Sequence, residues 1–125
     1  MPKVSRDTAS QVEDMGVMEG RYEEIGGYMV GFESFREYAD ATPLFKGLPE
    51  DRCQSPHWGY IEKGKVTFKY ADHDEVYETG DAYYAPPGHV PVVSAGTEIV
   101  EFSPAEEYGR TMEVLARNLA AMQAS

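Results

Sequence analysis

The stretch that decides the fold is GDAYYAPPGH, residues 80–89. Its Gly-Asp pair opens a turn, its two tyrosines favour a strand, and its Pro-Pro-Gly run ends that strand and reverses the chain. A similar unit lies upstream, where HWGYIEKG (residues 57–64) predicts a strand that ends in a turn at Gly64. Each unit carries one histidine beside its strand, so the two together predict a small barrel whose mouth binds a ligand.

Short strands separated by turn signals continue on both sides of this stretch. Polar turns are expected at residues 72–74 and 95–96, and a loop at 38–50 that contains Pro43, Gly47 and Pro49. The runs on either side of Gly64 predict a hairpin. No helical period is present between residues 17 and 102, so the pattern indicates an all-β barrel or sandwich. The expected strands cover residues 28–32, 53–62, 66–70, 82–85, 89–94 and 97–102.

The C-terminal segment has a different pattern. Ser103 is suited to cap a helix, Pro104 to occupy its first position, and Glu106 to complete the capping motif. An apolar stripe follows at three- and four-residue steps: Tyr108, Met112, Leu115, Leu119 and Met122. The chain is therefore expected to form a single domain, with a flexible arm at 1–14, a β-barrel at 15–102 and a helix at 103–123.

Composition excludes several classes of partner. The 125 residues carry a formal net charge of −11, which disfavours binding to duplex DNA or to anionic membranes. The single cysteine, Cys53, has no internal disulfide partner, and no apolar run approaches the length of a membrane span. The first residues lack the apolar core of a signal peptide, so a soluble cytoplasmic protein is expected.

Residues 60–66 (YIEKGKV) and the GD-x-x-x-x-PPG pattern at 80–88 resemble the two sequence signatures of the cupin superfamily. This resemblance extends over about residues 52–103. It implies a jelly-roll barrel, also called a double-stranded β-helix, and a metal ion held inside it. The residues at the family's ligand positions differ, however. Asp51, Cys53 and His57 stand where the first signature has two histidines and a glutamate, and His89 lies two residues before the last histidine position, which holds Pro91.

Cys53, His57 and His89 are competent ligands for one divalent ion, zinc or iron. Because four residues of straight strand span about 13 Å, the first two share an ion only if the chain bends at Ser55-Pro56. Each residue also has an ordinary structural interpretation: a buried filler for the cysteine, a hydrogen-bonded ring for His57, and an exposed ring for His89.

Nine tyrosines and a tryptophan suggest a barrel interior suited to a small organic ligand, with Trp58, Tyr60 and Tyr84 as the candidate contacts. Three functions stay open at this stage. The first is a small-molecule-binding barrel without a strong catalytic role. The second is a metal-dependent oxygenase or isomerase, in which Tyr84 or Glu101 handles protons. The third is an interaction module in which the arm and the helix assemble a dimer. A homodimer is the expected assembly, and whether the protein is an enzyme stays open.

Overall fold

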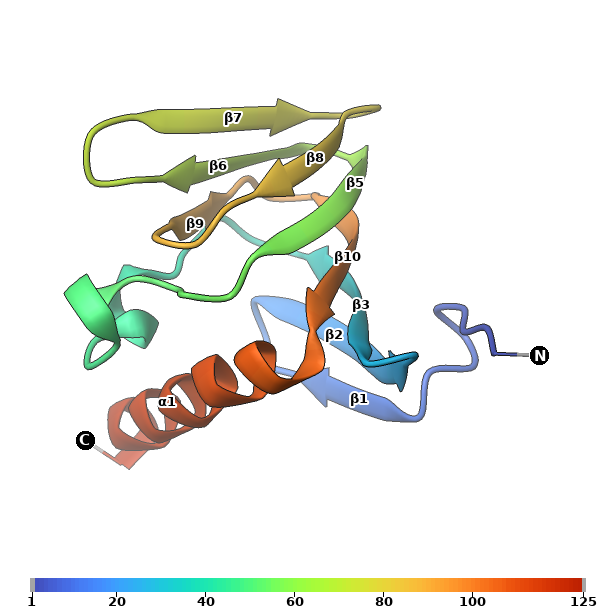
Figure 1. Cartoon of the computed structure of the whole chain (residues 1–125), viewed down its shortest axis with the longest axis horizontal. Coiled ribbons are helices and arrows are strands. Elements are labelled where there is room, and N and C mark those ends of the chain that lie inside the picture. Colours follow the sequence, from blue (N-terminus) through green and yellow to red (C-terminus); the bar gives the residue numbers. More distant parts are fainter. Residues whose placement is uncertain (1, 125) are drawn as a thin grey trace.

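Residues 2–124, which the computed structural model describes, fold into two antiparallel sheets and a C-terminal α-helix (Figure 1). The expected all-β jelly-roll class with a terminal helix is confirmed. The six-stranded sheet has the order β1 (Gln11–Asp14), β2 (Met18–Ile25), β3 (Tyr28–Phe35), β10 (Glu98–Pro104), β5 (His57–Lys63) and β8 (Ala82–Ala85). The four-stranded sheet has the order β4 (Ala39–Asp40), β9 (Val90–Val93), β6 (Lys65–Lys69) and β7 (Asp74–Glu78).

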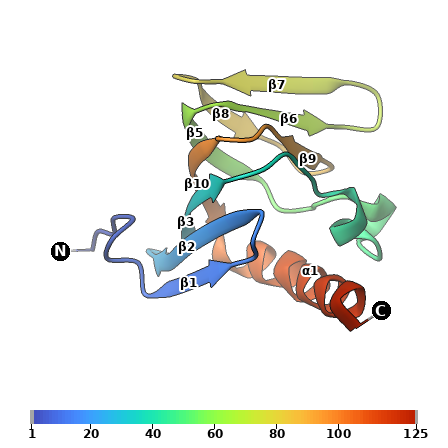
Figure 2. The same cartoon turned by 180° about the vertical axis from the view of Figure 1, so that it is seen from behind.

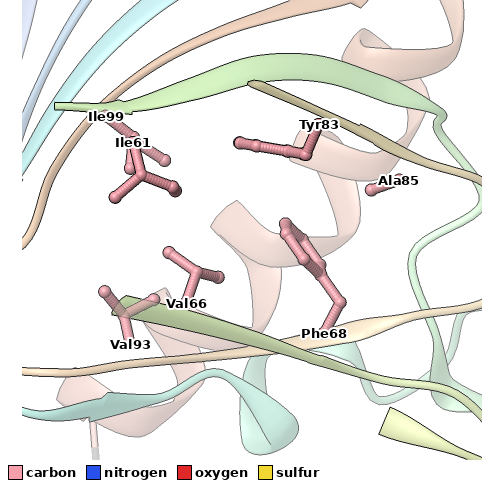
Figure 3. Packing of buried hydrophobic residues seen from close by; sticks show 7 residues of the cluster. All are labelled: Ile61, Val66, Phe68, Tyr83, Ala85, Val93 and Ile99. Carbon is pink, nitrogen blue, oxygen red and sulfur yellow. The ribbon is translucent and has the colours of Figure 1, made fainter. Parts of the chain in front are cut away.

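The two sheets enclose an apolar core, to which β6 and β8 contribute alternate residues and β5, β9 and β10 one residue each (Figure 3). Ile61 from β5 and Tyr83 from β8 meet Val66 and Phe68 from β6, and all four are buried. Ile61 is fully buried. Because side chains on a strand alternate between its faces, the residues between these positions point away from the core.

Gly64 carries the chain from one sheet to the other, so the hairpin expected at this position is wrong. β5 pairs with β8 and β10, whereas β6 pairs with β7 and β9. Gly64 has a φ of +101°, and a Cβ built there would lie 2.3 Å from Thr97 Oγ1. A turn this tight lets both strands keep their apolar faces inward while they change sheets.

The N-terminal arm is shorter than expected, because residues 11–14 form β1 and pair with β2. Arg6 also fixes the preceding segment to the barrel, since its guanidinium donates to Ser34 Oγ at 2.9 Å and to Glu62 Oε1 at 3.0 Å. Strand β2 was not expected from the sequence. The inward residues of β2 include Met18 and Tyr22, but charged residues between them obscure the alternation of apolar and polar side chains.

The loop at residues 38–50 contains β4 and two short 3-10 helices, η1 (Thr42–Phe45) and η2 (Pro49–Asp51). The helix α1 (Ala105–Ala124) lies beside η1 and beside the β1–β2 edge of the larger sheet (Figures 1 and 2). Asn118 anchors it, because its Nδ2 donates to the carbonyls of Leu44 and Lys46 at 2.6 and 2.8 Å. Among the described residues, no helix is long and apolar enough to cross a membrane.

The start of α1 differs from the sequence prediction. Ser103 and Pro104 still belong to β10, and the Ser103 hydroxyl contacts His57 instead of capping the helix. The predicted stripe is present, with Tyr108, Met112, Leu115 and Leu119 lining a groove between α1 and the sheet. Met122, at the far end of the stripe, is 51% exposed.

Candidate metal centre

Three buried side chains from distant parts of the chain converge inside the barrel. Cys53 Sγ and one ring nitrogen of each of His57 and His89 all lie within 4.8 Å of one another. The segment before β5 makes this possible, because residues 54–56 leave the strand conformation and bring Sγ to 3.6 Å from His57 Nε2. The bend expected at Ser55-Pro56 is therefore present.

A short backbone bridge holds Cys53 next to His89. The Cys53 amide donates to the His89 carbonyl at 2.8 Å, and the Gly88 amide donates to the Cys53 carbonyl at 2.7 Å. The Pro-Pro-Gly turn places His89 at this bridge, and Gly88 adopts a φ of +99° that favours glycine. The turn that identified the fold thus also positions one of the candidate ligands.

His89 directs a free lone pair into the cluster. Its Nδ1 donates to the Pro86 carbonyl at 2.8 Å, which leaves the neutral ring with an unprotonated Nε2. That Nε2 is buried and has no hydrogen-bond partner within residues 2–124. The rings of Phe68 and Tyr70 pack edge-on against the imidazole and hold its orientation. An unpartnered buried nitrogen costs about 1–3 kcal/mol, a cost that a bound ion removes.

His57 is held from its opposite side. Its Nδ1 lies 2.6 Å from Ser103 Oγ and 3.4 Å from Glu101 Oε1. These acceptors favour the tautomer with the hydrogen on Nδ1, so that the Nε2 lone pair points toward Cys53 Sγ. A carboxylate behind a histidine is the usual outer partner of a metal-binding imidazole.

The donor set fits a divalent transition metal. Burial lowers the pKa of His57 to about 4 and that of His89 to about 3, so both rings are neutral at ordinary pH. A thiolate sulfur and an imidazole nitrogen on one tetrahedral zinc lie about 3.6 Å apart, which the Cys53–His57 pair already matches. Burial raises the pKa of Cys53 to about 11, so an ion must displace the thiol proton when it binds.

The wall beside His57 carries two buried carboxyl groups that the sequence analysis did not bring together. Glu33 on β3 and Glu101 on β10 face the same interior, and Tyr22 donates to Glu33 at 2.7 Å while Tyr83 donates to Glu101. Burial is the main cause that raises the pKa of each carboxyl to about 7. The alternation of β3 was the available signal, since Glu33 shares its face with Met29 and Gly31.

A small cavity and a larger groove lie next to this wall. A cavity of about 10 Å³, lined by Glu33, Glu101 and Ser103, lies against Tyr22 and Tyr108. The same two tyrosines line a groove of about 470 Å³ between α1 and strands β1 to β3. The groove is mostly apolar, and it shares Tyr22, Met29 and Tyr108 with the small cavity, whose lining includes the residues that contact His57.

Similar folds are found among solved structures. No protein-family model matches the chain, and neither does any curated protein. An RmlC-like cupin from Shewanella frigidimarina superposes with a TM-score of 0.55 over 83% of this chain and 92% of that one, at 18% identity. This chain has the cupin fold. Two further structural neighbours are a protein of unknown function from Rhizobium leguminosarum and the Fe(II) form of HppE. The Rhizobium protein superposes with a TM-score of 0.58 at 13% identity, over 82% of this chain and 95% of that one. HppE superposes with a TM-score of 0.57 at 6% identity, over 82% of this chain and 60% of that one.

The expectation that Trp58, Tyr60 and Tyr84 line the interior of the barrel is wrong. They are 41%, 44% and 48% exposed and lie on the outer face of the larger sheet. Since His57 points inward on β5, its neighbour Trp58 must point outward. On β8 it is Tyr83, not Tyr84, that enters the core.

The other polar candidates lie away from the cluster. Asp51 is exposed and accepts a hydrogen bond from the Gly47 amide at 2.9 Å. His73 lies in an exposed turn, where its bond to Asp72 raises its pKa. Asp81 stabilises its turn by accepting from the Glu78 amide at 2.8 Å.

Proposed function

We propose that this cupin holds one divalent metal ion, zinc or iron, on Cys53, His57 and His89, and binds a small organic molecule beside it. The observation that carries the proposal is the convergence of three buried side chains that can ligate a metal ion, one of which offers the unpartnered Nε2 of His89. A buried polar atom without a partner is rare, because burial costs free energy that nothing repays. The Fe(II) form of a neighbour with the same fold supports iron as a candidate beside zinc.

The surrounding residues have complementary roles in this proposal. Ser103 and Glu101 orient the His57 ring so that its Nε2 stays unprotonated, and the Pro86 carbonyl does the same for His89. The apolar packing around the cluster excludes water, which strengthens each electrostatic contact. A bound ion would supply a Lewis acid in the position left open by three protein ligands. The groove under α1 is the space that an organic molecule would enter, and the cavity next to it is lined by Ser103 and Glu101, behind His57.

The experiment is a titration of metal-free protein with Co²⁺, a spectroscopic substitute for zinc. We expect one equivalent to bind and to produce a near-ultraviolet thiolate charge-transfer band. Cys53→Ser should remove the band, and His89→Ala should lower the affinity at least tenfold. His73→Ala is the matched control, because it removes an exposed histidine outside the cluster and should change neither. A titration without the band, or a band that survives in Cys53→Ser, would contradict the proposal.

A second candidate function, catalysis by the same centre, has one supporting observation. Glu101 lies between Tyr83 and His57, so a carboxyl group with a raised pKa stands behind one of the proposed ligands, on the Nδ1 side of its ring. Such a group is suited to accept or donate a proton of a bound molecule. Glu101→Gln should then retain Co²⁺ binding but lose any exchange of ligand protons with deuterated solvent. Equal exchange rates in the variant and the wild type would leave binding alone as the function.

A further inference from the structure

We propose that the organic ligand of this cupin is a cation, an amine with an apolar body, whose ammonium group lies against Glu33 and Glu101. This inference rests on the proposed function, since it names the chemical class of the molecule that enters the groove. It comes from the charges and the dimensions of the groove and of the cavity next to it, neither of which is lined by the three metal ligands.

The charged residues that line the groove and the cavity are all acidic. Glu13 and Glu113 line the outer groove, and Glu33 and Glu101 line the inner cavity. No lysine, arginine or histidine of the described chain lines either space. A carboxylate or phosphate ligand would therefore meet like charge along its whole path, whereas an ammonium group would meet opposite charge.

The inner cavity has the size of an ammonium group. Its volume of about 10 Å³ corresponds to roughly one water-sized probe, so it accepts a single heavy atom with its hydrogens. Both carboxyl groups face this space from neighbouring strands, and a shared cation relieves the repulsion between them. A primary amine offers three donors for these oxygens and for Ser103 Oγ.

The groove suits the remainder of such a molecule. Its lining consists mainly of apolar side chains, including Met29, Met112 and Leu119, in a volume of about 470 Å³. The rings of Tyr22 and Tyr108, whose centroids lie 6.2 Å apart, line both the groove and the inner cavity. Aromatic faces at this position favour a cationic group over a neutral one.

The test uses the full-length, metal-free protein, so that it does not depend on metal binding. Calorimetric titrations with n-hexylamine, n-hexanol and hexanoate compare one apolar chain with three head groups. We expect the amine to bind at least tenfold more tightly than the alcohol, and hexanoate to give no measurable heat. Glu33→Gln preserves the shape and the acceptor for Tyr22, and it should remove most of the preference for the amine. Glu78→Gln, which removes an exposed carboxylate on the other sheet, should leave that preference unchanged.

A second variant keeps the inference testable if Glu33→Gln does not fold. Glu113→Lys changes an exposed residue at the groove and should weaken amine binding while it improves hexanoate binding. Equal affinities for amine and alcohol, or a preference unchanged in both groove variants, would overturn the inference. Neither result would affect the metal site, because the Co²⁺ band of Cys53 reports that site separately.

Discussion

The buried carboxyl pair predicts that one conservative substitution stabilises the protein at alkaline pH. Burial, followed by the nearby Glu101 carboxylate, raises the pKa of Glu33 from 4.5 to about 7. A folded-state pKa above the unfolded value means that the native contribution is complete below pH 4.5 and is lost as pH rises through 7. One pKa unit corresponds to about 1.4 kcal/mol, so the charged Glu33 lowers the free energy of unfolding by about 3 kcal/mol at pH 8.

Glu33→Gln removes this titration and keeps an acceptor for the Tyr22 hydroxyl. Urea denaturation of metal-free protein should therefore show the variant more stable than wild type by as much as about 3 kcal/mol at pH 8, and by less than about 1 kcal/mol at pH 5. Ionisation of the two buried histidines affects both proteins alike and cancels in the difference. Glu78→Gln, an exposed control, should be neutral at both pH values. A variant that is less stable than wild type at pH 8 would refute this reasoning. The same change in the free energy of unfolding at pH 8 and at pH 5 would also refute it.

Three further predictions follow from the fold and the site. Gly64→Ala should destabilise the protein by more than about 2 kcal/mol in chemical denaturation, because its φ is +101° and its new Cβ would overlap Thr97; a neutral result would show that the crossing between the sheets relaxes easily. The rings of His57 and His89 should stay neutral in NMR titrations of metal-free protein down to about pH 5. Their contribution to stability is therefore complete above pH 6.5 and is lost as the pH falls through about 4 for His57 and about 3 for His89. A titration midpoint near pH 6.5 for either ring would contradict its burial. The homodimer remains a prediction. If it buries the exposed aromatic side chains Trp58, Tyr60 and Tyr84 of the larger sheet, Trp58→Ser should shift the sedimentation coefficient toward that of a monomer. An unchanged sedimentation coefficient would place the contact elsewhere.

The fold was predicted from the sequence mainly through the residues that form its turns. Glycine and proline favour the reversals at residues 80–88, so these positions indicated a small barrel, and their resemblance to a cupin signature implied the jelly roll. The apolar stripe of α1 was likewise local, since a helix repeats every three to four residues. The meeting of Cys53, His57 and His89 was also expected, because a bend at Ser55-Pro56 was the one local feature that allowed it.

The direction of each side chain, by contrast, depended on pairing between distant strands. A shift of one residue moves a side chain from the core to the solvent, and neighbours such as Tyr83 and Tyr84 do not differ enough in sequence to fix that choice. The carboxyl pair formed by Glu33 and Glu101 arises from the alignment of β3 with β10, which are far apart in the chain. Local sequence therefore determined where this chain turns and which donors it carries. Only the tertiary structure decided which side chains face one another, because strand register is a property of the whole sheet.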